Sequence, residues 1–153
     1  LLKKYQETSD ASLKQDLCAG ITSTKMPEII DAIVDDFENS EIIKPQDLRA
    51  WYRNVLANPF GQEQAWNWIR LEWPWLEATV GGDMEFATFI TVTANIFHTE
   101  ERLNQFKDFF EPKINTPGLT REIKMDTKVI ETKVNLVKKE QSAVNAAIAK
   151  AVD

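Results

Sequence analysis

The chain has 153 residues, 43% of them hydrophobic, and its eight Phe and five Trp supply enough apolar material for the core of one domain. Only five Gly and six Pro occur, and good helix formers fill much of the rest, so the composition favours an all-helical fold. The formal net charge of −6 argues against a nucleic-acid partner, because phosphate binding depends on clustered Lys and Arg.

Helix start and stop signals recur at short intervals through the first third of the chain. Polar residues at 9 and 10 are candidate N-caps, and a proline suits the first turn of a helix. The predicted helices run from Ser9 or Asp10 to about Gly20, from Pro27 to about Glu38, and from Pro45 to about Asn58.

Four of the five tryptophans fall within ten residues of the stretch AWNWIRLEWPWLEATVGGDMEF, residues 65–86, which Pro74 interrupts and two glycines end. At 100° per residue, one stripe of this segment comprises Trp66, Ile69, Trp73 and Leu76, and Trp68 and Trp75 lie elsewhere on the wheel. A stacking platform for a ligand would need its rings on one exposed face. We therefore expect these tryptophans to pack between successive helices of the core.

Residues 86–97, FATFITVTANIF, form the longest run without a charge. The alternation in TFITVT indicates a strand, whereas the helices predicted on either side favour a fully buried helix. Twelve residues are too few to cross a bilayer, which needs about 20. We expect a soluble protein with no membrane partner.

The C-terminal third predicts three more helices. Thr99 is a candidate N-cap with two glutamates in the first turn, and that helix should end before Pro112. The loop PKINTPGL leads into a long helix from about Thr120 to Glu140 and a last one from about Ser142 to Val152.

The long helix has two apolar stripes. One comprises Ile123, Ile130, Val134 and Val137; the other, roughly opposite, comprises Met125, Val129 and Leu136. A helix with two apolar faces needs neighbours on both. About nine or ten short helices of this kind predict an all-α, HEAT/armadillo-like stack of antiparallel helices, a superhelical solenoid, with residues 1–153 as a single domain. No fixed-period repeat is present, so this prediction depends on packing alone.

Neither the single histidine nor the single cysteine predicts a catalytic site. His98 lies in HTEE, but the H-E-x-x-H spacing of a catalytic zinc site is absent, and a surface histidine at a helix start is expected. Cys18 cannot form an internal disulfide and is expected to be buried and structural, which fits a reducing cytoplasm. GxSxG and phosphate-binding glycine loops are also absent. We therefore predict no catalytic, cofactor-binding or metal-binding residue in this chain.

One wedge of the long helix, between its two stripes, is basic. Its members are Arg121, Lys124, Lys128, Lys138 and Lys139, with Glu131 among them. Such a wedge could bind a peptide carboxylate, for which Arg121, Lys124 and Lys128 are the candidates, or it could be the solvated face of a helix.

The stretches NPFGQEQAWNWIRLEW, FHTEERLNQFKDFF and VNLVKKEQSAVNAAIAKAV together resemble the C-terminal helical domain, of the endoplasmic-reticulum-aminopeptidase type, of the aminopeptidase N family of zinc metallopeptidases. The likeness is strongest to bacterial members and covers about residues 58–153, whereas residues 1–44 match in helical character only. The residues that carry it are Asn58, Pro59, Gly61, Ala65, Trp66, Phe97, Thr99, Arg102, Leu103, Phe109 and Phe110.

The resemblance implies a C-terminal cap. In that family a separate catalytic domain binds one zinc ion and removes N-terminal residues from peptides, and the helical domain covers the catalytic site and limits which peptides enter. The zinc motif and the substrate-binding loop are absent here, and Leu1 in place of Met suggests a fragment. The implied partners are the catalytic domain of the same polypeptide and peptide substrates, with zinc in the parent enzyme only.

An independent helical-repeat adaptor, which binds proteins on a concave face and has no enzymatic role, is the alternative. The two hypotheses differ in what precedes Leu1: an open reading frame with H-E-x-x-H supports the cap, and an adjacent start codon supports the adaptor.

Overall fold

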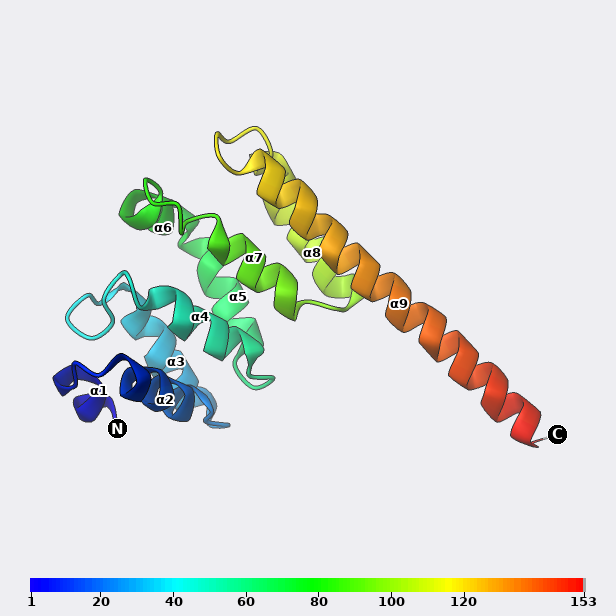
Figure 1. Ribbon diagram of the computed structural model, residues 1–153, viewed down its shortest axis with the longest axis horizontal. Helices are drawn as coiled ribbons and strands as arrows, with labels where there is room; N and C mark the ends of the chain where they lie inside the picture. The colour runs from blue at the N-terminus through cyan, green and yellow to red at the C-terminus, as the bar shows by residue number, and fades with distance from the viewer. Residues whose placement is uncertain (153) are drawn as a thin grey trace. The chain divides into compact units, whose positions relative to one another are not determined.

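The computed structural model describes residues 1–152, and these form nine α-helices, two 3-10 helices and no strand (Figure 1). The all-α prediction is confirmed. The chain divides into two compact units, Leu1–Phe89 and Ile90–Asp153. Each unit is described by itself.

The first unit contains six α-helices whose ends follow the residues that predicted them. Their bounds are α1 Leu2–Glu7, α2 Ala11–Thr22, α3 Pro27–Asp35 with the 3-10 helix η1 Asp36–Glu38, α4 Leu48–Ala57, α5 Gln62–Leu71 and α6 Trp73–Val80. The Asp10 side chain caps α2 by accepting the Leu13 N–H at 3.0 Å. Pro27 is the first residue of α3, as expected. Pro45 instead opens a turn, and α4 begins three residues later.

Helix α4 lies at the centre of this unit and packs against α2 and α5. Its Trp51 and Tyr52 are at most 1% exposed. The Trp51 indole N–H donates to the Tyr5 hydroxyl at 2.9 Å, and that hydroxyl donates to Asp47 Oδ2 at 3.3 Å. This pair of bonds ties α1, which is too short to be stable alone, to the central helix.

The four clustered tryptophans belong to the hydrophobic core of the first unit. Trp66, Trp68 and Trp73 are 0%, 7% and 5% exposed, and Trp75 is half-buried with its ring 6.2 Å from that of Trp68. Trp68 also donates its indole N–H to Glu38 Oε1 at 3.1 Å. The prediction that these rings pack between successive helices is confirmed.

The second unit is built on an antiparallel helix pair. Helix α7, Thr88–Ile96, begins in the first unit and ends in the second, and α8 Glu100–Phe110, the 3-10 helix η2 Glu111–Lys113 and α9 Thr120–Val152 follow. The segment TFITVT is therefore helical rather than extended, as expected. Thr99 caps α8 by accepting the Arg102 N–H at 3.2 Å. Figure 1 shows α8 beside the first part of α9, which continues well beyond it.

Two predictions about the C-terminal helix are wrong. α9 runs without a break through Gln141 and Ser142, because neither glycine nor proline occurs between Gly118 and its end and Ala-rich sequence sustains it. The second apolar stripe has no neighbour among residues 1–152: Met125, Val129 and Leu136 are 48%, 38% and 53% exposed. Only the first stripe is buried, and only as far as Val134.

Across residues 1–152, none of the helices combines the length and the apolar character that a bilayer-crossing segment needs.

Candidate functional site

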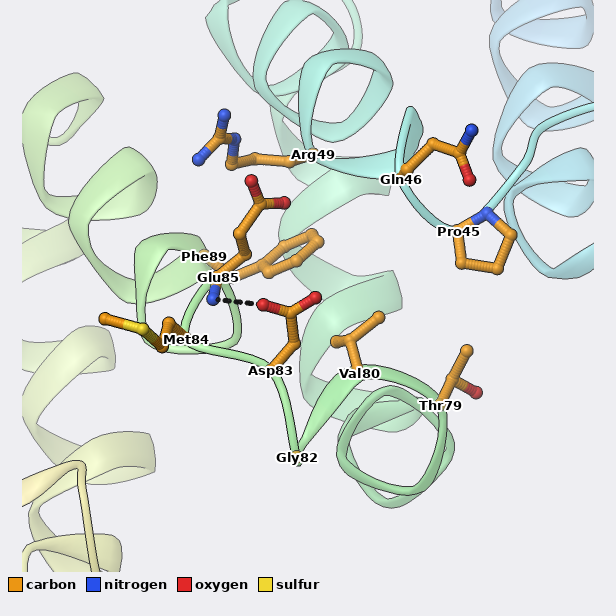
Figure 2. A pocket seen from close by; sticks show the side chains of 10 residues that line it. All are labelled: Pro45, Gln46, Arg49, Thr79, Val80, Gly82, Asp83, Met84, Glu85 and Phe89. Atoms are coloured by element: carbon orange, nitrogen blue, oxygen red, sulfur yellow. Dashed lines mark hydrogen bonds between the residues drawn. The ribbon is translucent and has the colours of Figure 1, made fainter.

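The first unit contains an open cleft of about 600 Å³ between the start of α4 and the loop that follows α6 (Figure 2). Its lining residues are Pro45, Gln46, Arg49, Thr79, Val80, Gly82, Asp83, Met84, Glu85 and Phe89. Arg49 comes from α4, and the two carboxylates come from the loop on the other side.

Local sequence explains the shape of this loop. A Cβ at Gly81 would lie 2.1 Å from the carbonyl oxygen of Glu77, so only glycine allows α6 to end as it does. Asp83 Oδ1 then accepts the backbone N–H of Glu85 at 3.1 Å, the bond drawn in Figure 2. Across the cleft, Arg49 Nη1 donates to Thr88 Oγ1 at 3.3 Å, which orients the guanidinium.

The cleft brings charged groups of both signs together. Arg49 offers a planar cation suited to a carboxylate, and Asp83 and Glu85 offer anions suited to an amine. The lining residues include no histidine, cysteine or serine, so no activated nucleophile of the Ser–His or Cys–His kind can form there.

The residues predicted to contact a peptide carboxylate are in the second unit. Arg121, Lys124 and Lys128 are all exposed and lie three and four residues apart on α9, hence on one face. Met125 and Val129, half-exposed, flank them. The result is an exposed strip, which we call the basic strip, of three cations beside two apolar side chains.

Two other members of the basic wedge, Lys138 and Glu131, pair with α8, whereas Lys139 is exposed. Lys138 Nζ lies 3.0 Å from Glu100 Oε1. Glu131 Oε1 lies 2.9 Å from Lys107 Nζ, and the hydrogen bond between them raises the pKa of Lys107. Glu131 therefore pairs with the neighbouring helix, and the three cations of the basic strip lie N-terminal to it.

A buried carboxyl group, that of Asp126, lies on the apolar face of α9, with the half-buried Glu122 one turn before it. Asp126 is 4% exposed, and Thr91 Oγ1 on α7 donates to it at 3.3 Å and also bonds Glu122. Burial, with the hydrogen bond and charge of Glu122, raises the pKa of Asp126 to about 7. Nearby, Lys133 Nζ donates to the carbonyl oxygen of Ala94 at 2.6 Å, and burial lowers the pKa of this lysine.

His98 lies at the surface and Cys18 lies in the core, as the sequence predicted. His98 is exposed just before α8. Cys18 is 3% exposed, and burial raises the pKa of its thiol to about 11, which favours the protonated thiol at neutral pH. Within the described part of the chain, no three His, Cys, Asp or Glu side chains are grouped to hold a metal ion, and these residues therefore do not fit a zinc site.

Sequence reasoning missed Arg49 and Asp126. The cleft around Arg49 joins segments more than 30 residues apart, which no local pattern reveals. Asp126 did carry a signal, because it lies on the same helical face as Ile123 and Ile130 and is therefore an acid on an apolar stripe.

Comparison with known proteins gives a consistent result over the whole chain. The family model described as the ERAP1-like C-terminal domain matches residues 1–132. The chain is 64% identical over 153 residues to aminopeptidase N of Lactobacillus helveticus and 54% identical over 152 residues to aminopeptidase N of Lactobacillus delbrueckii subsp. lactis. Those alignments cover 100% and 99% of this chain but 18% of each relative. A glutamyl aminopeptidase of Sus scrofa is 35% identical over 111 residues, 72% of this chain and 12% of the relative.

Proposed function

Because the chain belongs to the ERAP1-like C-terminal domain family, we propose that it is the C-terminal domain of a zinc-dependent aminopeptidase N. In this proposal the domain is an inactive, HEAT-like helical cap. It covers the catalytic site of the same polypeptide and shapes which peptides reach it, and the parent enzyme removes N-terminal amino acids from peptides in the cytoplasm.

One observation carries the proposal. Relatives named aminopeptidase N align with the whole chain but extend over more than five times its length, while the described residues hold no group of metal ligands. Both observations support assigning zinc binding and peptide-bond hydrolysis to another part of the parent enzyme.

The exposed surfaces of both units support a role in peptide access. The basic strip places Arg121, Lys124 and Lys128 beside apolar Met125 and Val129, a combination suited to the carboxylate end of a peptide and an apolar side chain near it. The cleft at Arg49 supplies a second site with charged groups of both signs.

The first experiment tests whether the 153-residue chain is an inactive cap or carries the aminopeptidase activity itself. The purified 153-residue chain should bind no stoichiometric zinc and release no product from an aminoacyl anilide, whereas the full-length polypeptide should do both. Turnover by metal-free, contaminant-free chain would contradict the proposal, and so would a full-length polypeptide without aminopeptidase activity.

The second experiment tests the basic strip in the full-length enzyme. Arg121→Glu should change the preference for peptide length, measured as kcat/KM over peptides of increasing length, and leave an aminoacyl anilide unaffected. Lys4→Glu, at an exposed lysine of α1 in the first unit, is the charge-matched control. Equal length preferences for the two variants would remove the basic strip from the proposal and leave the cap itself standing.

A further inference from the structure

The C-terminal part of α9 has no neighbour within residues 1–152. Helix α8 has 11 residues and α9 has 33, and the ion pair between Lys138 and Glu100, the first residue of α8, marks where the two helices part (Figure 1). Every described side chain from residue 135 onward is exposed. We call residues 139–152 the overhang; at 1.5 Å per residue it is about 20 Å long.

The overhang continues the buried stripe of the same helix. Val144 follows Ile130, and Ile148 follows Val134, by two full heptads, so both lie on the face that is buried further up. Val144, Ile148 and Val152 are nevertheless 56%, 57% and 81% exposed. An isolated helix of this length is marginal in water, so an apolar stripe along it indicates a missing neighbour.

Charge disfavours a second copy of the overhang as this neighbour. The overhang contains two lysines, Lys139 and Lys150, and one glutamate, Glu140. A second overhang is a poor partner: antiparallel pairing about Val144 would bring Lys138 of one copy to Lys150 of the other. The contact would also be one short helix face on each side, well below the ~1,200 Å² of a stable interface.

The alignments show where such a neighbour can be. The family model ends at residue 132, but the two aminopeptidase N relatives align through 153 and 152 residues, and more than four fifths of their length lies outside this chain. We propose that the overhang docks, through Val144, Ile148 and Val152, into an apolar groove on the rest of the same aminopeptidase polypeptide. This inference rests on the proposed function.

Hydrogen exchange tests the docking in the full-length polypeptide. Amides of residues 144–152 should exchange at least tenfold more slowly there than in the 153-residue chain. The double variant Val144→Lys, Ile148→Lys should restore fast exchange in the full-length polypeptide. Ser142→Lys with Ala146→Lys adds the same charge on the opposite face and should leave the slow exchange intact.

Several outcomes would overturn the inference. Equal exchange in the two proteins would mean that nothing covers the overhang. Slow exchange in the 153-residue chain that increases with protein concentration would identify a second copy as the neighbour. Equal effects of the two double variants would show that the apolar stripe is not the contact. Aminoacyl anilide hydrolysis by the same full-length preparation tests the proposed function separately, since activity without protection of residues 144–152 refutes only the docking.

Discussion

The buried carboxyl of Asp126 predicts an unusual dependence of stability on pH. Burial and Glu122 raise its pKa from 3.8 to about 7, so the folded unit holds a proton that the unfolded chain releases. The free energy of unfolding should therefore fall as pH rises from about 4 to about 7 and level off above that range. Roughly three pH units at about 1.4 kcal/mol each give a loss of at most about 4 kcal/mol.

Asp126→Asn should remove this loss. Asparagine has the shape of the protonated acid: its oxygen can accept from Thr91, and its NH₂ can donate to Glu122. At pH 4 the variant and the parent should be about equally stable. At pH 7.5 the variant should be the more stable by about 2 to 4 kcal/mol.

Urea denaturation at pH 4, 5.5 and 7.5, followed by far-UV circular dichroism, measures this difference. All five tryptophans lie between residues 51 and 75, in the first unit, so their fluorescence reports that unit separately. Asp108→Asn removes an exposed carboxylate from α8 and is the matched control. A difference between Asp126→Asn and the parent that stays constant with pH, or a variant less stable at pH 7.5, would refute the reasoning.

Two further predictions concern local packing. Gly61→Ala would place a Cβ 2.9 Å from Val55 Cγ1 and 3.1 Å from its carbonyl oxygen, and should cost about 1 to 3 kcal/mol in thermal or urea unfolding. Gly82→Ala meets nothing within 4 Å and should be far milder; equal effects would contradict the steric argument. Thr99→Ala removes the oxygen that accepts the Arg102 N–H and should cost about 1 kcal/mol by urea denaturation, whereas Thr99→Ser, which keeps the cap, should not.

Helix ends could be predicted from the sequence where a single capping residue or proline sets the end of the helix. Asp10 and Thr99 cap their helices through side-chain oxygens, and Pro27 opens α3, because these effects involve atoms within three residues of each other. The break expected at Gln141 was wrong for a related reason: neither glycine nor proline occurs there, and the Gln and Ala residues around it favour a helix.

The sites were less predictable because they depend on segments that meet only in the folded chain. The cleft requires the loop at Asp83 to lie opposite Arg49, and nothing local encodes that arrangement. The second apolar stripe of α9 shows that a clear local pattern can also predict a contact that the described residues do not make. Apolar Met125 and Leu136 predicted a neighbour, yet both are exposed, since a pattern indicates what a face can bind and not where its partner is.

The bond from Lys133 to Ala94 has a consequence for synthesis. The carbonyl group of Ala94, in the last turn of α7, accepts a hydrogen bond from an ammonium 39 residues further along the chain. Because a chain is made from its N-terminus at about 5 to 20 residues per second, that turn lacks its cation for several seconds after Ala94 has been added. During this interval the C-terminal end of α7 lacks this contact with α9, which forms only after Lys133 has been added.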